Sequence, residues 1–279
     1  MEEKDMIKKT LFYIGLVFGL FYVIFPFYWA LNGSLLPEEK IFRPPLTYAP
    51  IPPTLESYRQ AFGNEDFVYS IRNSIIVAGG TTLLALLIGS MAAGALARYG
   101  LRGKNIIMLI ILSMTMFPQI SVLGAIHKII SSLGMYNRLP GLILSYMLFT
   151  LPFTVWVLAS FLESLPKDLE EAAYVDGATP FQTFWRILVP LALPGMVTTG
   201  LLAFIAAWNE YLFALSLTNT NRARTVPVAI ANFAGEGMHQ TPWGAIMAAS
   251  VVVTLPLVIL VLIFQRKIIG GMTAGAVKE

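Results

Sequence analysis

The feature that most constrains this chain is a series of long apolar stretches that recur along its 279 residues. A helix needs about 20 apolar residues to cross the hydrocarbon core of a bilayer, and lipid offers no partner for a free backbone N–H or C=O group. The sequence therefore predicts an all-α membrane protein. It would be a single transmembrane domain over 1–279, with six spans at about 11–31, 73–97, 105–126, 141–162, 195–217 and 243–264.

Composition agrees with this prediction and argues against other classes of protein. Hydrophobic residues make up 56% of the chain and charged residues only 13%, whereas a soluble domain carries about 25% charged residues. The sequence has no cysteine, and its two histidines, His127 and His239, stand far apart, so no metal site is predicted. The net charge of +3 is not gathered into a basic stripe. Membrane lipid is therefore an expected partner and nucleic acid is not.

A signal peptide is the alternative for the first apolar stretch, because Lys4, Lys8 and Lys9 precede it. Its length and its end in Phe27-Tyr28-Trp29, rather than in small residues of a cleavage site, favour a span. With six spans and the N-terminus inside, 11 of the 19 Lys and Arg residues lie on the inner side and eight on the outer side. The positive-inside rule then predicts both termini, and the segment 164–190, in the cytoplasm.

The polar segment between the fourth and fifth stretches carries the signals of two short helices. The first helix is expected to begin near Ser164–Pro166, because proline is tolerated in a first turn. Asp168, Glu170 and Glu171 then place negative charge near the positive end of that helix. Gly177 is expected to end it, because glycine readily adopts the left-handed conformation common at helix C-termini.

A second helix is expected to start directly after that glycine. Thr179 is a favoured N-cap, Pro180 suits the first helical position, and Gln182 stands three residues after the cap. This is the pattern of a capping box. Pro190 and Pro194 are expected to end this helix before the next span.

Several of these residues resemble the EAA loop of ABC importer permeases, in which Glu-Ala-Ala is followed by Gly and then by Ile-x-Leu-Pro. The matching positions are Glu171, Ala172, Ala173, Gly177, Ile187 and Pro190, with Val189 in place of the Leu. The chain resembles sugar-import permeases of the maltose and trehalose type over most of its length, most clearly in the segments 176–180, 207–210 and 265–278. Cap signals alone would also fit an ordinary amphipathic loop, but the six spaced matches favour the family.

The resemblance implies the architecture of a type I ABC importer permease, in which 164–190 forms cytoplasmic coupling helices. The positions that it assigns to coupling with an ATP-binding subunit are Glu171, Ala172, Ala173, Asp176, Gly177 and Pro190. It also implies that the tail, 265–279, reaches between the ATP-binding subunits, with contacts at Thr273, Ala274 and Gly275. Without the resemblance, this tail would be interpreted as a frayed terminus.

The same resemblance implies the partners: a second homologous permease, two ATP-binding subunits and an extracytoplasmic sugar-binding protein, all at a bacterial or archaeal cytoplasmic (inner) membrane. The chain itself has no phosphate-binding loop, because Gly103-Lys104 is followed by Asn105 and no glycine stands five positions earlier. ATP and Mg are therefore expected on the partner subunit. No cofactor and no enzymatic activity are expected in this chain.

The residues Trp208, Asn209, Glu210 and Tyr211 form a candidate substrate path in the predicted fifth span. A charged side chain at the centre of a span costs about 2.5–3.5 kcal/mol and usually faces protein or a water-filled path. Trp208 and Tyr211 would stack on a sugar ring, and Asn209 and Glu210 would bond its hydroxyls. The open alternatives are that Glu210 lies near the outer interface or pairs with a second subunit.

Two other functions were weighed against an importer subunit. An ion-gradient-driven secondary transporter would show several carboxylates or histidines inside the spans, whereas this sequence shows Glu210 and no clear repeat with broken helices. An intramembrane enzyme would need paired carboxylates, a zinc motif or a nucleophile with its base, and none is recognisable. The sequence thus predicts a permease subunit of an ATP-driven importer of a sugar, such as the disaccharides trehalose or maltose.

Overall fold

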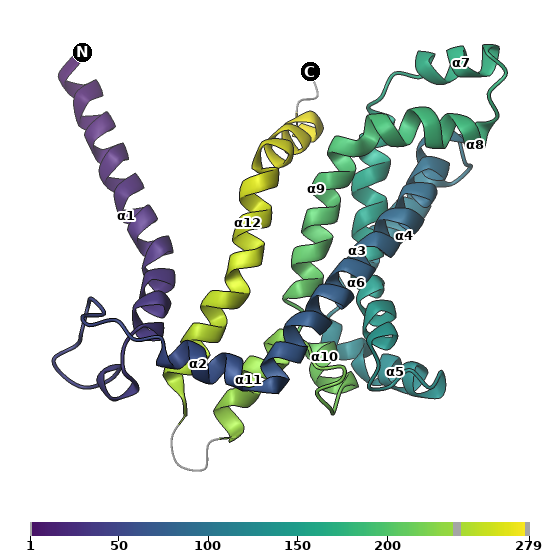
Figure 1. Cartoon of the computed structure of the whole chain (residues 1–279). Helices are drawn as coiled ribbons and strands as arrows, with labels where there is room; N and C mark the ends of the chain where they lie inside the picture. The colour runs from purple at the N-terminus through teal and green to yellow at the C-terminus, as the bar shows by residue number, and fades with distance from the viewer. Residues whose placement is uncertain (1, 237–240, 277–279) are drawn as a thin grey trace. The chain divides into compact units, whose positions relative to one another are not determined.

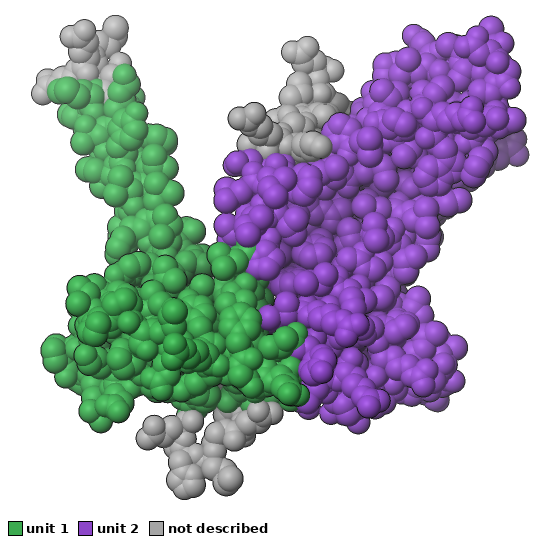
Figure 2. Space-filling view, viewed as in Figure 1, with its two compact units in different colours: residues 1–68, 229–255 green, residues 69–228, 256–279 purple. Residues whose placement is uncertain are grey.

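The structure is a computed structural model that describes residues 2–236 and 241–276. The regular elements of these residues are all helical, which confirms the predicted all-α fold (Figure 1). The chain forms two compact units, Met1–Val68 with Ala229–Leu255 and Tyr69–Val228 with Pro256–Glu279 (Figure 2). The division between the two units falls within the helices α3, α11 and α12.

The first unit contains one long apolar helix and a short amphipathic one. Its elements are α1 (Glu2–Ser34), η1 (Glu38–Lys40) and α2 (Glu56–Gly63), with parts of α11 (Val226–Glu236) and α12 (Trp243–Ala276). Most side chains of α1 are exposed, as expected of a helix that faces lipid. Near its end, Gly33 packs closely against the side chain of Met247, which would have to shift to admit a larger side chain.

The second unit is a bundle of longer helices that pack around a small apolar core. Its elements are α3 (Glu65–Arg98), α4 (Lys104–Thr115), α5 (Gln119–Ser132), α6 (Leu139–Glu163), α7 (Asp168–Val175), α8 (Pro180–Thr183), η2 (Phe184–Leu188), α9 (Val189–Trp208) and α10 (Leu212–Leu217). One core cluster joins α3, α6, η2 and α9 through Ala93, Leu158, Ala159, Leu162, Leu188 and Ala192. Small residues in this cluster let the helix backbones approach closely, as is common in membrane bundles.

Within the described residues, five stretches of helix are long and apolar enough to cross a bilayer: Met6–Ser34, Glu65–Arg98, Leu139–Glu163, Pro180–Trp208 and Trp243–Gln265. The predicted continuous span 105–126 is not continuous in the structure. α4 and α5 meet there at 93°, with Pro118 as the residue that precedes α5. Proline has no N–H for the helix and disfavours a helical conformation in the residue before it. Pro118 therefore explains why the apolar stretch forms two helices that meet at an angle.

The structure also corrects the expectation that Pro190 and Pro194 end the helix that starts after Gly177. The helix runs on through both prolines, so that Pro180–Trp208 forms one apolar stretch. The turn before Pro190, η2, is π-helical. A π turn is wider than an α turn, and it relieves the clash between a proline ring and the carbonyl four residues earlier. The predicted fifth span, 195–217, accordingly begins earlier than expected and ends at Trp208, after which α10 is a separate helix.

Asn137 holds two loops of the second unit together at the end that carries α5 and α10 (Figure 1). Its backbone is left-handed, with φ of 56°. Its side chain accepts the N–H groups of Asn219 at 3.1 Å and Thr220 at 3.2 Å, and donates to Thr220 Oγ1 at 2.8 Å. Its own N–H donates to Leu217 O at 2.9 Å. The side chain and the backbone conformation of Asn137 therefore tie the loop after α10 to the loop after α5.

Asn137→Ala is expected to lower the free energy of unfolding by about 2 kcal/mol, because it loses hydrogen bonds and forces alanine into a left-handed conformation. Asn137→Gly keeps the backbone conformation and loses only the side-chain bonds, so we expect about half that cost. Unfolding of the purified chain in detergent measures both values. Equal losses for the two variants would contradict the contribution of the backbone conformation.

Candidate functional site

The helix α7 ends in the way that the sequence predicts. Gly177 is left-handed, with φ of 80°. Its N–H donates to Tyr174 O at 3.1 Å, and the N–H of Ala178 donates to Ala173 O at 2.9 Å. These two bonds make a Schellman motif, which satisfies the last carbonyl groups of the helix. The predicted start differs slightly, because α7 begins at Asp168, after Pro166 rather than at it.

The next helix starts with the predicted capping box. The N–H of Gln182 donates to Thr179 Oγ1 at 3.3 Å, and the N–H of Thr179 donates to Gln182 Oε1 at 2.9 Å. α7 and α8 are thus two helices joined by a short turn whose backbone bonds are satisfied at both sides. These bonds give the helix pair a well-defined conformation.

The matched EAA residues divide between surface and interior. Glu171, Ala172, Asp176 and Gly177 are exposed, whereas Ala173 is buried. Pro190 is also exposed, but it lies on α9, which follows α7, α8 and η2 along the chain. Apolar side chains add to the exposed surface around them, namely Leu169, Tyr174, Phe181 and Val175, the last being 87% exposed. Acidic and apolar groups side by side on one exposed helix pair suit contact with another protein.

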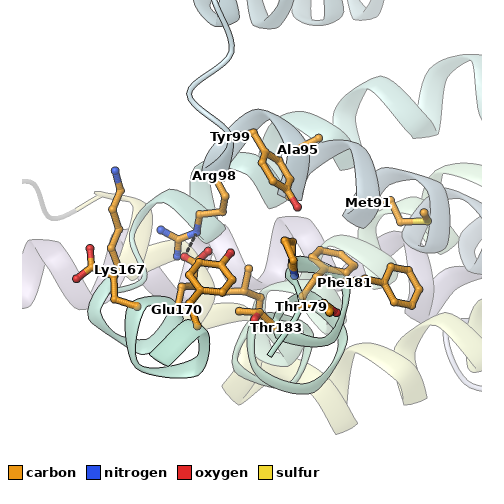
Figure 3. A pocket seen from close by; sticks show the side chains of 15 residues that line it. Met91, Ala95, Arg98, Tyr99, Lys167, Glu170, Thr179, Phe181 and Thr183 are labelled. Atoms are coloured by element: carbon orange, nitrogen blue, oxygen red, sulfur yellow. Dashed lines mark ion pairs between the residues drawn. The ribbon is translucent and has the colours of Figure 1, made fainter. Parts of the chain in front are cut away.

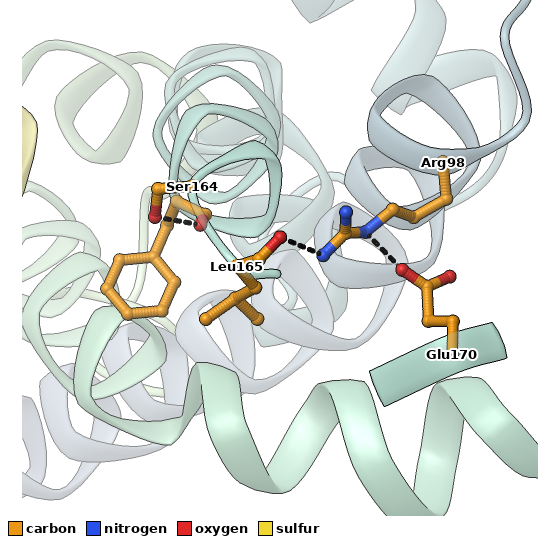
Figure 4. Close-up of polar contacts among 5 residues, drawn as sticks. Arg98, Ser164, Leu165 and Glu170 are labelled. Atoms are coloured by element: carbon orange, nitrogen blue, oxygen red, sulfur yellow. Dashed lines mark hydrogen bonds and ion pairs between the residues drawn. The ribbon is translucent and has the colours of Figure 1, made fainter. Parts of the chain in front are cut away.

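A buried ion pair, which the sequence does not predict, fixes α7 to the end of α3. Arg98 Nε lies 2.9 Å from Glu170 Oε1, and the two side chains are only 5% and 9% exposed. Arg98 Nη2 also donates to Leu165 O at 3.1 Å (Figure 4). The sole signal in the sequence was opposite charge at the ends of two apolar stretches, which does not specify a pair. Lys104 and Glu163 form a second, more exposed pair at 2.7 Å between α4 and α6.

A cavity of about 570 Å³ lies beside this ion pair, between α3, α7 and the start of α8. Its lining mixes long apolar side chains with the charged groups of the pair, including Met91, Arg98, Tyr99, Glu170, Phe181 and Phe184 (Figure 3). Gly94 forms part of its wall, and a Cβ there would lie 2.6 Å from Phe184 Cε2. Glycine at this position therefore lets η2 pack directly on the α3 backbone.

The four residues of the candidate substrate path do not form one surface. Trp208 is buried and ends α9, whereas Asn209 and Tyr211 are exposed. Asn209 Nδ2 donates back to Ile205 O at 2.9 Å. Glu210 lies past the end of α9, outside the apolar stretch Pro180–Trp208. Of the alternatives that the sequence leaves open for Glu210, this placement favours a position near the end of the span over one at its centre.

Glu210 instead closes the start of α10. Its carboxylate accepts the N–H groups of Phe213 at 2.7 Å and Ala214 at 3.1 Å. Burial raises the pKa of this carboxyl, and the bond from the Phe213 N–H opposes the rise. Glu210 thus has a structural role at a helix N-terminus. The tail residues Thr273, Ala274 and Gly275 fall beyond the residues whose side chains the structure describes.

The comparisons with known proteins agree with this geometry. A family described as "Binding-protein-dependent transport system inner membrane component" matches residues 85–273, a range that includes α7, α8 and the ion pair. The chain belongs to this family. As a member, it is a permease component of ABC import systems and a multi-pass membrane protein, which confirms the family predicted from the EAA residues.

Two relatives match the permease over nearly its whole length. It is 42% identical to the trehalose/maltose transport system permease protein MalG of Thermococcus litoralis, over 99% of both chains. It is 44% identical to the trehalose transport system permease protein SugB of Mycobacterium tuberculosis, over 92% of this chain and 93% of that one. A solved bacterial ABC transporter that imports alginate shares the fold, with a TM-score of 0.81 at 20% identity, over 94% of this chain and 97% of that one.

Proposed function

We propose that this permease belongs to an ATP-driven importer of a disaccharide such as trehalose or maltose, delivered by an extracytoplasmic binding protein. The choice of sugar is supported by two relatives, 42% and 44% identical to this chain, whose names give trehalose or maltose. The permease would form half of the translocation path and a second, homologous permease the other half. Within the path, Asn209 and Tyr211 are the exposed members of the candidate set, and we propose them for contact with the sugar.

The observation that carries the coupling role is the exposed surface of α7 and its turn. The buried side of α7 is held by the ion pair between Arg98 and Glu170. Glu171, Ala172 and Asp176 lie on the exposed surface, while Glu170 on the same helix is anchored to Arg98. We propose that one of two ATP-binding subunits docks on this surface in the cytoplasm. ATP and Mg would bind to those subunits, whose closure pushes α7 and reopens the path to the outside. Both termini would be cytoplasmic, and the tail at Thr273–Gly275 would add a second contact.

The direct test is a pull-down of the tagged permease in mild detergent from its own cells, followed by ATPase assays with binding protein and a panel of disaccharides. We expect an ATP-binding subunit and a second permease to be recovered, and one sugar to raise ATP hydrolysis. Recovery of the chain alone, without ATPase and with uptake that follows an ion gradient, would reject the proposal in favour of a secondary transporter.

Gly177→Trp is expected to lower sugar uptake by about 10-fold or more, which lies within the usual range of coupling between sites. The substitution strains the left-handed turn and places a bulky group on the docking surface. Gly103→Trp is a matched control, because Gly103 has φ of 81° and, like Gly177, no atom within 4 Å of an added Cβ. Both variants introduce similar backbone strain. A docking role for α7 therefore predicts that Gly177→Trp loses uptake while Gly103→Trp keeps it. Full uptake in Gly177→Trp would count against the coupling role of α7.

A further inference from the structure

The helix α3 is held by polar contacts at both ends of its course through the second unit. At its C-terminal end, Arg98 binds Glu170 of α7 and the carbonyl of Leu165, which lies between α6 and α7. Both contacts are made by the same guanidinium group. Arg98 therefore holds α7 and the segment between α6 and α7 at the same time. The planar guanidinium presents Nε to the Glu170 carboxylate and Nη2 to the Leu165 carbonyl.

At the other end, α3 holds the loop that follows α10. Asn73 Nδ2 donates to Asn221 O at 3.1 Å and to Arg224 O at 2.9 Å. The neighbouring Ser74 Oγ accepts the N–H of Val226 at 2.9 Å. Asn73 and Ser74 are both buried. Side chains in such positions keep their partners, because an unpaired polar group away from water is costly.

The helix between these two ends is continuous and packs closely against its neighbours. α3 contains no proline, and Ala78, Ala85 and Ala93 on its inner face are fully buried. Gly94 packs against Phe184, and Ala93 belongs to the core shared with α6 and α9. Asn73 and Arg98 are 25 positions apart, which corresponds to about 37 Å of helix. We therefore expect a displacement of one end to be carried to the other end.

We propose that α3 is a mechanical link between the coupling surface on α7 and the loop 218–225, with Arg98 and Asn73 as positioning residues at its two ends. This inference rests on the proposed function, because it assumes that α7 receives the motion of an ATP-binding subunit. Outside the membrane, the loop 218–225 would present that motion to the loaded binding protein. The same link would carry the signal of a docked binding protein back to α7, since coupling between two sites is reciprocal.

The absence of cysteine from the sequence allows a test in which the link is broken and then remade. In the pair Arg98→Cys with Glu170→Cys, both charges are removed together, so no unpaired charge remains buried. The variant is assembled with its second permease and ATP-binding subunits in liposomes. ATP hydrolysis is then measured with and without binding protein loaded with the sugar that stimulates the unaltered complex.

We expect the reduced pair to lose stimulation by the loaded binding protein by about 5-fold or more, and a short bifunctional thiol cross-linker to restore it. Each single cysteine variant, treated with the same linker, is the control for modification alone. A role confined to folding would not respond to a cross-link added after assembly. Stimulation equal to that of the unaltered complex in the reduced pair, or no recovery in a pair that mass spectrometry shows to be cross-linked, would overturn the proposal.

The other end of α3 is tested by combining Asn73→Ala with the reduced cysteine pair. If both act through α3, the combined loss of stimulation equals the larger single loss instead of their product. Asn105→Ala, an exposed asparagine on α4, is the matched control and should leave stimulation unchanged. Losses that multiply would show two independent routes and overturn the link. The unaltered complex tests the proposed function separately, because its stimulation by sugar does not depend on these variants.

Discussion

Glu170→Ala is expected to lower the free energy of unfolding of the permease by about 3–5 kcal/mol, the usual cost of removing one partner of a buried ion pair. The loss arises because Arg98 stays charged, and its side chain is only 5% exposed. The guanidinium would keep its bond to Leu165 O but would have no carboxylate. Chemical or thermal unfolding of the purified chain in detergent micelles measures the change.

Two variants separate this effect from a general loss of acidic charge on α7. Glu171→Ala removes the exposed neighbouring carboxylate and should change stability by no more than about 0.5 kcal/mol. The double variant Arg98→Met with Glu170→Leu replaces both charges by apolar groups and should recover most of the stability. If Glu170→Ala proved as stable as Glu171→Ala, the ion pair would contribute nothing to the fold.

Leu158→Ala is expected to cost about 2 kcal/mol or more, at the lower end of the range for leucine in a buried core. Leu158 is 1% exposed and lies in the cluster that joins α3, α6, η2 and α9. In a bilayer, lipid tails are as apolar as leucine, so the cost comes from weaker van der Waals attraction among the side chains that would surround the new cavity.

Leu144→Ala on the same helix is the matched control for Leu158→Ala, because Leu144 is 44% exposed and would face lipid or a partner. We expect its stability in detergent to change by less than about 0.5 kcal/mol. The comparison is made by the same unfolding measurement. Similar losses at the two positions would mean that helix propensity, rather than packing, sets the cost.

Much of the coupling loop could be predicted from the sequence because its signals are local. The left-handed Gly177 and the capping box of Thr179 with Gln182 depend on residues within a few positions of one another. The all-helical fold follows from the length of the apolar stretches, since a bilayer leaves few other ways to pair the backbone. The family followed from the spacing of the EAA residues, and the match over residues 85–273 confirms it.

Other features were decided only by the tertiary structure. The π turn before Pro190 and the 93° bend at Pro118 depend on how neighbouring helices accept a proline, which the proline alone does not specify. The sequence left open whether Glu210 is an intramembrane charge, because no local signal marks the end of α9 at Trp208. The pairing of Arg98 with Glu170 joins residues far apart in sequence, and any of several charges could have partnered either one. The sequence by itself determined that the long apolar stretches are helical and how α7 and α8 are capped, because those energies are local. The tertiary structure determined which helices hold α7 in place, because that choice depends on packing between distant segments.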